Sequence, residues 1–154
     1  MAESASPQAL DTFPRLLIHH AQVRRGKTAM REKDLGIWQS WTWSAVADEV
    51  RALACGLAEM GFQRGENLAI VGDNRPRMYM MMTAVQCLGG VPLPLYQDAV
   101  ANEMLFVLLD AEVRFVFVED QEQVDKVLEI QAQLPQLEHV LYDDPRGMRH
   151  YTLP

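Results

Sequence analysis

The chain has 154 residues, of which 49% are hydrophobic and 23% charged, a composition typical of one globular domain with a buried core. Its net charge of −7 is concentrated in residues 78–154, where 4 basic side chains face 12 acidic ones, so the sequence offers no cationic surface for a nucleic-acid backbone. The short apolar runs and the two cysteines exclude a transmembrane protein, a disulfide-rich secreted miniprotein and a coiled coil.

The first predicted element is a helix that follows a polar tail over residues 1–10. Thr12 can cap its N-terminus, and Pro14 falls in the first turn, where a missing N–H costs no hydrogen bond. Gly26 is expected to end the helix in a left-handed conformation.

A hairpin and a second helix come next. Two short strands at 28–32 and 37–41 flank a turn rich in Asp and Gly. The second helix is predicted from Thr42 or Ser44 to Gly61 because its apolar side chains recur at intervals of three and four residues. These side chains are Val46, Val50, Leu53, Leu57 and Met60.

From residue 66 onward, apolar strands alternate with helices. The strands are predicted at 68–72, 91–95, 114–118 and 138–142, and the helices at 76–88, 101–110 and 121–133. Each strand-plus-helix unit takes about 23 to 24 residues, which suits a parallel crossover and is far longer than a hairpin needs. The sequence therefore predicts an α/β fold for 11–142, a mostly parallel sheet with helices on both faces, preceded by the helix and hairpin.

Individual residues refine this picture. Pro92 and Pro94 cannot donate to a sheet ladder, so their strand is expected to be short, irregular or at an edge. Cys55 and Cys87 lie among apolar residues on their helices and are expected to fill the core. The three tryptophans are expected to pack between the hairpin and the second helix, and the alternative is a ligand platform. They are Trp38, Trp41 and Trp43.

The sequence holds few candidates for chemistry. Neither a Walker loop nor a dinucleotide-binding glycine loop occurs, so no segment predicts a phosphate cradle. His19 and His20 point about 100° apart on a helix and are not expected to chelate one metal ion. Asp73 and Glu119-Asp120 follow predicted strands and could bind Mg²⁺ or accept a phosphoryl group, although Asp120 is also a good helix cap.

The order of several short segments resembles the N-terminal part of the adenylate-forming acyl-CoA synthetases. These segments are 41–43 (WTW), 61–62 (GF), 65–70 (GENLAI), 74–76 (NRP) and 88–96 (LGGVPLPLY). Two further segments, 106–111 (FVLLDA) and 118–126 (VEDQEQVDK), are most similar to bacterial long-chain fatty-acid–CoA ligases.

The resemblance implies an enzyme that joins a fatty acid to coenzyme A through an acyl-adenylate, using ATP and Mg²⁺. The motifs that carry this chemistry in the family match no position here, so no catalytic, cofactor-binding or metal-binding residue is expected in this chain. Residues 143–154 are expected to form a turn and tail leading to a missing remainder. The fragment alone is expected to be inactive and to bind none of these cofactors; the alternative is a stand-alone regulatory or phosphoacceptor-like α/β module.

Expectations about partners and location follow. The parent protein is expected to bind a fatty acid and to be cytoplasmic, with peripheral contact to the inner membrane through Arg24, Arg25 and Lys27 as an open alternative. The fragment is expected to self-associate through apolar surface exposed along the methionine-rich helix at 78–88.

Overall fold

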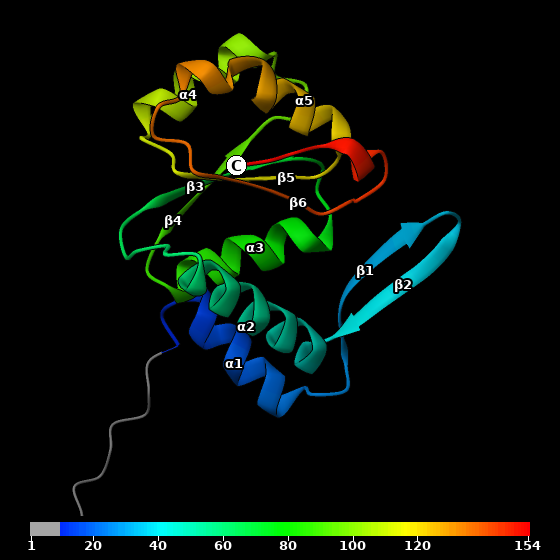
Figure 1. Ribbon diagram of the computed structural model, residues 1–154. Helices are drawn as coiled ribbons and strands as arrows, with labels where there is room; N and C mark the ends of the chain where they lie inside the picture. The colour runs from blue at the N-terminus through cyan, green and yellow to red at the C-terminus, as the bar shows by residue number, and fades with distance from the viewer. Residues whose placement is uncertain (1–9) are drawn as a thin grey trace, which may run out of the picture.

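The computed structural model describes residues 10–154, so all of the predicted polar tail except Leu10 lies outside the described residues. Helices and strands alternate along most of the chain (Figure 1). In chain order they are α1 (Phe13–Val23), β1 (Thr28–Asp34), β2 (Ile37–Thr42), α2 (Trp43–Glu59), β3 (Asn67–Val71), α3 (Pro76–Cys87), β4 (Val91–Leu95), α4 (Ala101–Asp110), β5 (Phe115–Val118), α5 (Gln121–Ile130) and β6 (His139–Tyr142), with short 3₁₀ turns at η1 (Gln131–Gln133) and η2 (Met148–His150).

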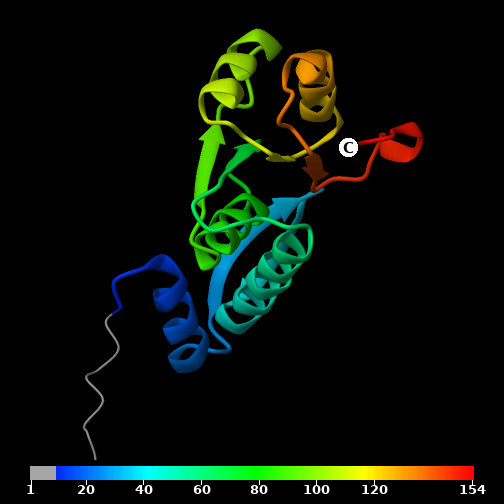
Figure 2. The same cartoon turned by 60° about the vertical axis from the view of Figure 1, so that its left-hand side comes forward.

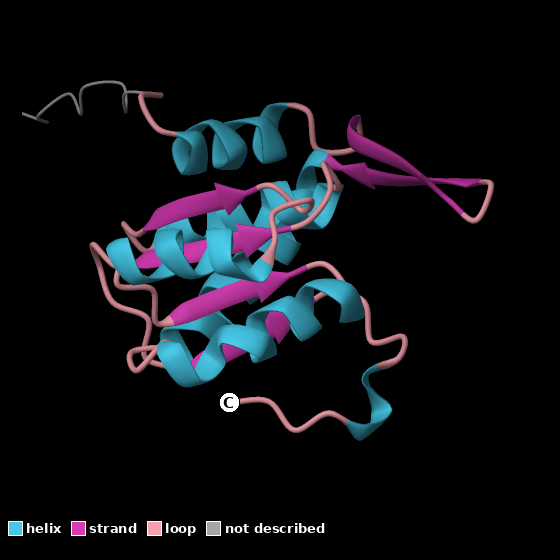
Figure 3. Ribbon diagram, turned by 90° about the horizontal axis from the view of Figure 1, so that it is seen from above, coloured by secondary structure: helices cyan, strands magenta, loops and turns pink. Residues whose placement is uncertain are grey.

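The main sheet is parallel and has the strand order β4-β3-β5-β6, which confirms the predicted α/β class. β4 is an edge strand, as Pro92 and Pro94 predicted, because it pairs with β3 alone. β1 and β2 form a separate antiparallel hairpin. Seen from above, this hairpin projects beyond the sheet (Figure 3).

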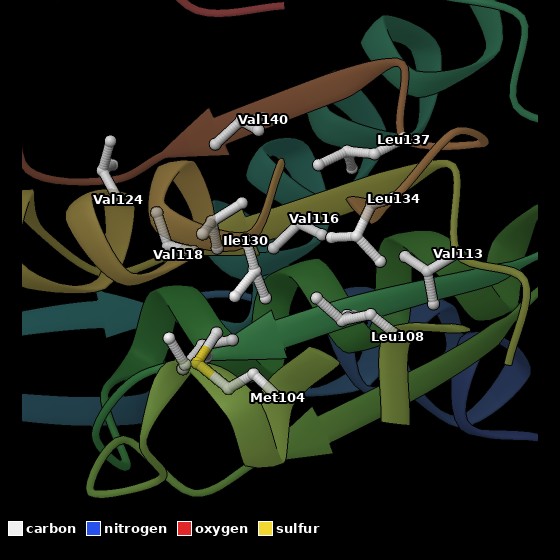
Figure 4. Packing of buried hydrophobic residues seen from close by; sticks show 14 of the residues in the cluster. Met104, Leu108, Val113, Val116, Val118, Val124, Ile130, Leu134, Leu137 and Val140 are labelled. Carbon is white, nitrogen blue, oxygen red and sulfur yellow. The ribbon is translucent and has the colours of Figure 1, made fainter. Parts of the chain in front are cut away.

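Helices cover both faces of the sheet. α2 and α3 lie on one face with α1 outside them, and α4 and α5 lie on the other (Figures 1 and 2). Along β3 the side chains alternate, so Leu68 and Ile70 enter the α2–α3 core while Ala69 and Val71 enter the α4–α5 core. Figure 4 shows the second of these cores, in which Met104 and Leu108 of α4 pack against the sheet.

Local signals explain most helix ends. The Thr12 and Thr42 hydroxyls cap α1 and α2 by accepting from the N–H groups of the third residue along. Gly61 has φ +89°, and the next N–H returns to Leu57 O at 2.9 Å, which confirms the predicted stop of α2. The prediction for Gly26 is wrong: it does not take positive φ, and α1 ends instead with the Arg24 N–H bonded to His20 O.

Three expectations about burial are also wrong. Cys55 and Cys87 are exposed rather than in the core, because the helix α1 beside them leaves a groove open. Trp38 is 57% exposed near the hairpin tip, where the Arg31 guanidinium stacks on its ring, whereas Trp41 and Trp43 do pack against the core.

The methionine-rich helix α3 is more buried than the self-association hypothesis assumed. Met80 and Met81 are buried, because α3 lies between the sheet and α2. Larger exposed apolar side chains lie elsewhere, such as Phe106 on α4, which is 73% exposed. Self-association itself stays a prediction.

Residues 143–154 turn back over the α4–α5 side. Met148 is buried, and the Tyr151 hydroxyl donates to Asp125 Oδ1 at 2.6 Å while it accepts from Gln121 Nε2 at 2.8 Å. Pro154 O accepts from the Val140 N–H at 3.4 Å, so the tail lies along the outer edge of β6. Among residues 10–154, no helix has the length and apolar character needed to span a bilayer.

Candidate functional site

The carboxyl ends of β3 and β5 form the candidate site. In open parallel sheets, ligands bind beyond the carboxyl ends of the strands, at the point where successive crossovers turn to opposite sides. Here the chain leaves β3 for β4 on one side and then returns across β3 to β5 on the other. The switch point therefore lies between β3 and β5, next to Gly72 and Glu119.

A carboxylate fills this switch point. The ladder continues past β5, because the Glu119 N–H donates to Val71 O at 2.9 Å and so holds the Glu119 side chain over Gly72. Glu119 Oε2 accepts from the Asp73 N–H at 2.5 Å, and Glu119 Oε1 pairs with Arg75 Nε at 2.6 Å. The cavity left at this point measures only about 10 Å³, roughly room for one water molecule.

The close packing explains why residue 72 is glycine. A Cβ atom on Gly72 would lie 2.7 Å from Glu119 Cβ and 3.0 Å from Glu119 Oε2, which is closer than van der Waals contact allows. The missing side chain is thus what allows the carboxylate to occupy the crevice.

Two arginines at the N-terminus of α3 organise the surrounding charges. Arg75 precedes Pro76, which favours the extended backbone conformation that Arg75 adopts and starts the helix at the proline. Cations at a helix N-terminus are unfavourable with respect to the helix dipole. Carboxylates from four other segments of the chain offset this cost. They are Glu32 (3.5 Å) and Glu119 for Arg75, and Glu49 (2.7 Å) and Asp143 (3.2 Å) for Arg77.

The two carboxylates after β6 have pKa values shifted in opposite directions. Burial raises the pKa of Asp143, although the nearby Arg77 guanidinium opposes this effect. Asp144 accepts hydrogen bonds from the side chain and the backbone N–H of Arg146, and these bonds lower its pKa. Folding therefore favours the neutral form of Asp143 and the ionised form of Asp144.

A more open cleft of about 400 Å³ lies beside the switch point, between the loops after β3 and β4. Asp73, Asn74, Gln97 and Asp98 supply its polar groups. The nearby Lys126 ammonium already has partners, since it donates to Gln97 O at 2.6 Å and forms an ion pair with Glu122 at 3.0 Å. The two carboxylates give this cleft a negative charge, which opposes that of a triphosphate.

The structure brings Asp73 and Glu119 to one edge, as their positions after strands suggested. The Glu119 carboxylate is paired with Arg75 rather than left open to Mg²⁺ or a phosphoryl group, whereas Asp73 lines the open cleft. Asp120 caps α5 by accepting from the Gln123 N–H at 3.2 Å, which confirms that prediction. Sequence reasoning missed the role of Arg75 and Arg77, although their placement around Pro76 at a predicted helix start was a usable signal.

The adjacent histidines lie on α1, far along the chain from this edge. Both are half-buried, and His20 packs against Trp43 with ring centroids 4.7 Å apart. His20 Nδ1 is buried without a hydrogen-bond partner, and burial lowers the pKa of His20, with a further contribution from Arg24. Among the described residues, no three His, Cys, Asp or Glu side chains are grouped closely enough to hold a metal ion.

These observations define the class of the protein: an open, parallel α/β sheet of the kind that binds ligands at its carboxyl edge, here with its switch point closed by an ion pair. The chain belongs to the AMP-binding enzyme family, whose sequence model matches residues 17–152. This confirms the resemblance to adenylate-forming acyl-CoA synthetases.

Named relatives and solved structures agree with this assignment. The chain is 30% identical over 106 residues to the long-chain-fatty-acid–CoA ligases FadD15 of Mycobacterium bovis and Mycobacterium tuberculosis, covering 69% of this chain and 18% of theirs. Its fold matches the anthranilate CoA ligase AuaEII, solved with anthranoyl-AMP, with a TM-score of 0.79 at 22% identity over 84% of this chain and 24% of that one. The N-terminal domain of FACL13 from Mycobacterium tuberculosis gives a TM-score of 0.77 at 19% identity, covering 88% of this chain and 34% of that one. The chain thus spans less than a fifth of the length of the FadD15 relatives.

Proposed function

We propose that this chain is the N-terminal segment of a long-chain fatty-acid–CoA ligase. In the proposed reaction, a fatty carboxylate attacks the α-phosphate of ATP, which releases pyrophosphate and forms an acyl-adenylate. The thiol of coenzyme A then attacks the acyl carbonyl and displaces AMP. The similarity to FadD15 over 69% of this chain is the observation that carries the proposal.

Within that enzyme, residues 11–142 are proposed to act as a scaffold rather than as a catalytic unit. Glu119 and Arg75 close the switch point, and Asp73 and Asp98 give the neighbouring cleft a charge that repels phosphate. ATP, Mg²⁺ and coenzyme A would accordingly be held by parts of the protein other than this segment. The fragment alone is proposed to be inactive.

The substrate class is tested on the full-length gene product. With ATP·Mg²⁺ and coenzyme A, it should convert palmitate or oleate to the acyl-CoA and release pyrophosphate. Exclusive activity on acetate or on an amino acid would contradict the long-chain assignment.

The scaffold role is tested on the 154-residue chain by titration calorimetry with ATP·Mg²⁺. The expected result is no saturable binding in the submillimolar range and no pyrophosphate release with palmitate. Saturable binding, or slow but reproducible nucleotide turnover, would show that the closed edge opens to nucleotide and that the segment is more than a scaffold.

A further inference from the structure

A groove of about 250 Å³ runs between α1 and α2. Its walls are almost entirely apolar and come from three helices, with the end of α3 closing one side. The side chains that matter most are Leu17, Ile18, Val50, Ala54, Cys55 and Cys87. The groove shares no lining residue with the cleft or the cavity at the carboxyl edge.

The α2 wall of the groove is a straight stripe of residues. Its lining residues on α2 follow one another at intervals of three, one, three, one and three, which places them in a single stripe along the helix. They are Ala47, Val50, Arg51, Ala54, Cys55 and Ala58. At 1.5 Å per residue this stripe extends about 16 Å, so the groove suits an extended, unbranched chain better than a compact ring system.

One end of the groove is polar and cationic. There it continues into a second hollow of about 190 Å³, with which it shares Ile18, Ala47 and Arg51. Arg25, on the segment that follows α1, and Arg51 supply two guanidinium groups to this hollow, and Asp48 supplies one carboxylate. The Arg51–Asp48 pair is long, at 3.4 Å, and both side chains are at least 70% exposed, so it is weak and leaves Arg51 able to bind another anion.

We propose that this groove binds an unbranched aliphatic carboxylate. The alkyl chain would lie along the α2 stripe, and the carboxylate would reach Arg51 and Arg25, which can bind it through paired N–H groups. An apolar groove that opens onto excess positive charge favours such an anion over a neutral or cationic amphiphile of equal length. The site lies apart from the carboxyl edge and needs neither ATP nor coenzyme A, so the proposed ligase function and this binding site can fail independently.

The chain carries built-in reporters of occupancy. Cys55 and Cys87 are its only cysteines, and both line the groove. Burial raises the pKa of the Cys87 thiol, in agreement with a partly dehydrated position that keeps the thiolate fraction small. An alkyl chain in the groove would cover both thiols and slow their reaction with a soluble disulfide reagent.

The test measures thiol labelling of the 154-residue chain with and without dodecanoate, below its micellar concentration. Dodecanoate should slow labelling in a saturable way, whereas dodecanol should act only at higher concentration and dodecyltrimethylammonium should act least. Arg51→Gln and Arg25→Gln should each raise the half-protecting concentration of dodecanoate by about two- to five-fold, as expected for an exposed ion pair. Lys33→Gln, on the hairpin, should leave it unchanged.

A second variant separates binding from a general surfactant effect. In Cys55→Ser/Cys87→Ser/Glu129→Cys the thiol moves to an exposed position on α5, and dodecanoate should not protect it. Equal protection of this thiol, or equal potency of dodecanol and dodecanoate on the native chain, would overturn the proposal. Protection that grows with protein concentration alone would overturn it as well, because a second copy would then be covering the groove.

Discussion

The two ends of the parallel sheet are both closed by arginine–carboxylate pairs, but they use these pairs differently. At the amino ends of the strands, Arg114 bridges Glu66, just before β3, and Glu138, just before β6, where its Nη2 lies 2.5 Å from Glu138 Oε2. The same guanidinium also lies over the Phe115 ring. The Glu138 side chain is 51% exposed, whereas those of Arg114 and Glu66 are 29% and 22% exposed, so this clamp lies at the surface on its Glu138 side.

At the carboxyl ends, the pairs reach into the sheet. The Glu119 side chain is only 14% exposed and occupies the crevice between β3 and β5, where a ligand would otherwise contact the strand ends. At the amino edge, ion pairs thus bridge the segments before the strands, whereas at the carboxyl edge the Glu119 carboxylate fills the crevice. The comparison indicates that the number of salt bridges at an edge does not by itself set its stability, because the burial of each carboxylate affects how much its pair contributes.

The largest expected effect comes from emptying the filled crevice. Glu119→Ala removes the acceptor for the Asp73 N–H and the partner of Arg75, so the free energy of unfolding should fall by about 2 to 3 kcal/mol. Urea denaturation followed by circular dichroism measures this loss. The matched change at the other edge, Glu138→Ala, should cost clearly less, and equal losses would show that burial does not separate the two edges.

Much of this comparison rests on elements that were visible in the sequence. Strand spacing predicted the parallel sheet, prolines predicted the edge position of β4, and cap residues predicted where α1 and α2 begin. The cap and proline signals depend on a few neighbouring residues, and the strand spacing depends on one strand-plus-helix unit at a time, so none of these signals requires knowledge of the strand order.

The closed crevice could not be predicted in the same way. Glu119 and Arg75 are 44 positions apart, and only the strand order places them side by side. The two cysteines illustrate the same limit. Helical periodicity places Cys55 next to Ala54, which is buried. Only the position of α1 determines that Cys55 itself faces an open groove. Both the closed crevice and the exposed cysteines depend on packing between segments far apart in the chain, which a single sequence indicates only weakly.

A smaller effect is expected from adding one methyl group at the filled edge. Gly72→Ala places a Cβ against Glu119 and should lower the free energy of unfolding by about 1 to 2 kcal/mol, because the carboxylate must move from its donors. Gly56→Ala is the matched control: this residue lies inside α2 with no heavy atom within 4 Å of an added Cβ. It should stabilise the protein by about 0.5 to 1 kcal/mol. Chemical denaturation of both variants should therefore give opposite signs, and two losses of similar size would contradict the crowding at Gly72.

The smallest expected effects are in the pH dependence, where the two edges should again differ. The hydrogen bond from Arg114 lowers the pKa of Glu138, so the stability that Glu138 contributes is present above about pH 4.3, the ordinary value for glutamate, and is lost as the pH falls. Burial raises the pKa of Asp143, so its favourable contribution exists below about pH 3.9 and is lost as the pH rises through the raised value.

Replacing each carboxylate by the corresponding amide allows these opposite pH dependences of stability to be measured. As the pH rises from about 4 toward 7, Asp143→Asn should become progressively more stable relative to the native protein. Glu138→Gln should become less stable relative to the native protein at lower pH, as the pH rises from about 2 to about 4.3, and should then stay level up to about pH 7. Asp144→Asn is the closest control, because it sits next to Asp143 but has its pKa lowered by Arg146, so it should follow Glu138→Gln. If instead the curves of Asp143→Asn and Asp144→Asn run in parallel, burial does not dominate the charge of Asp143, and the filled edge responds to acid in the same way as the surface clamp.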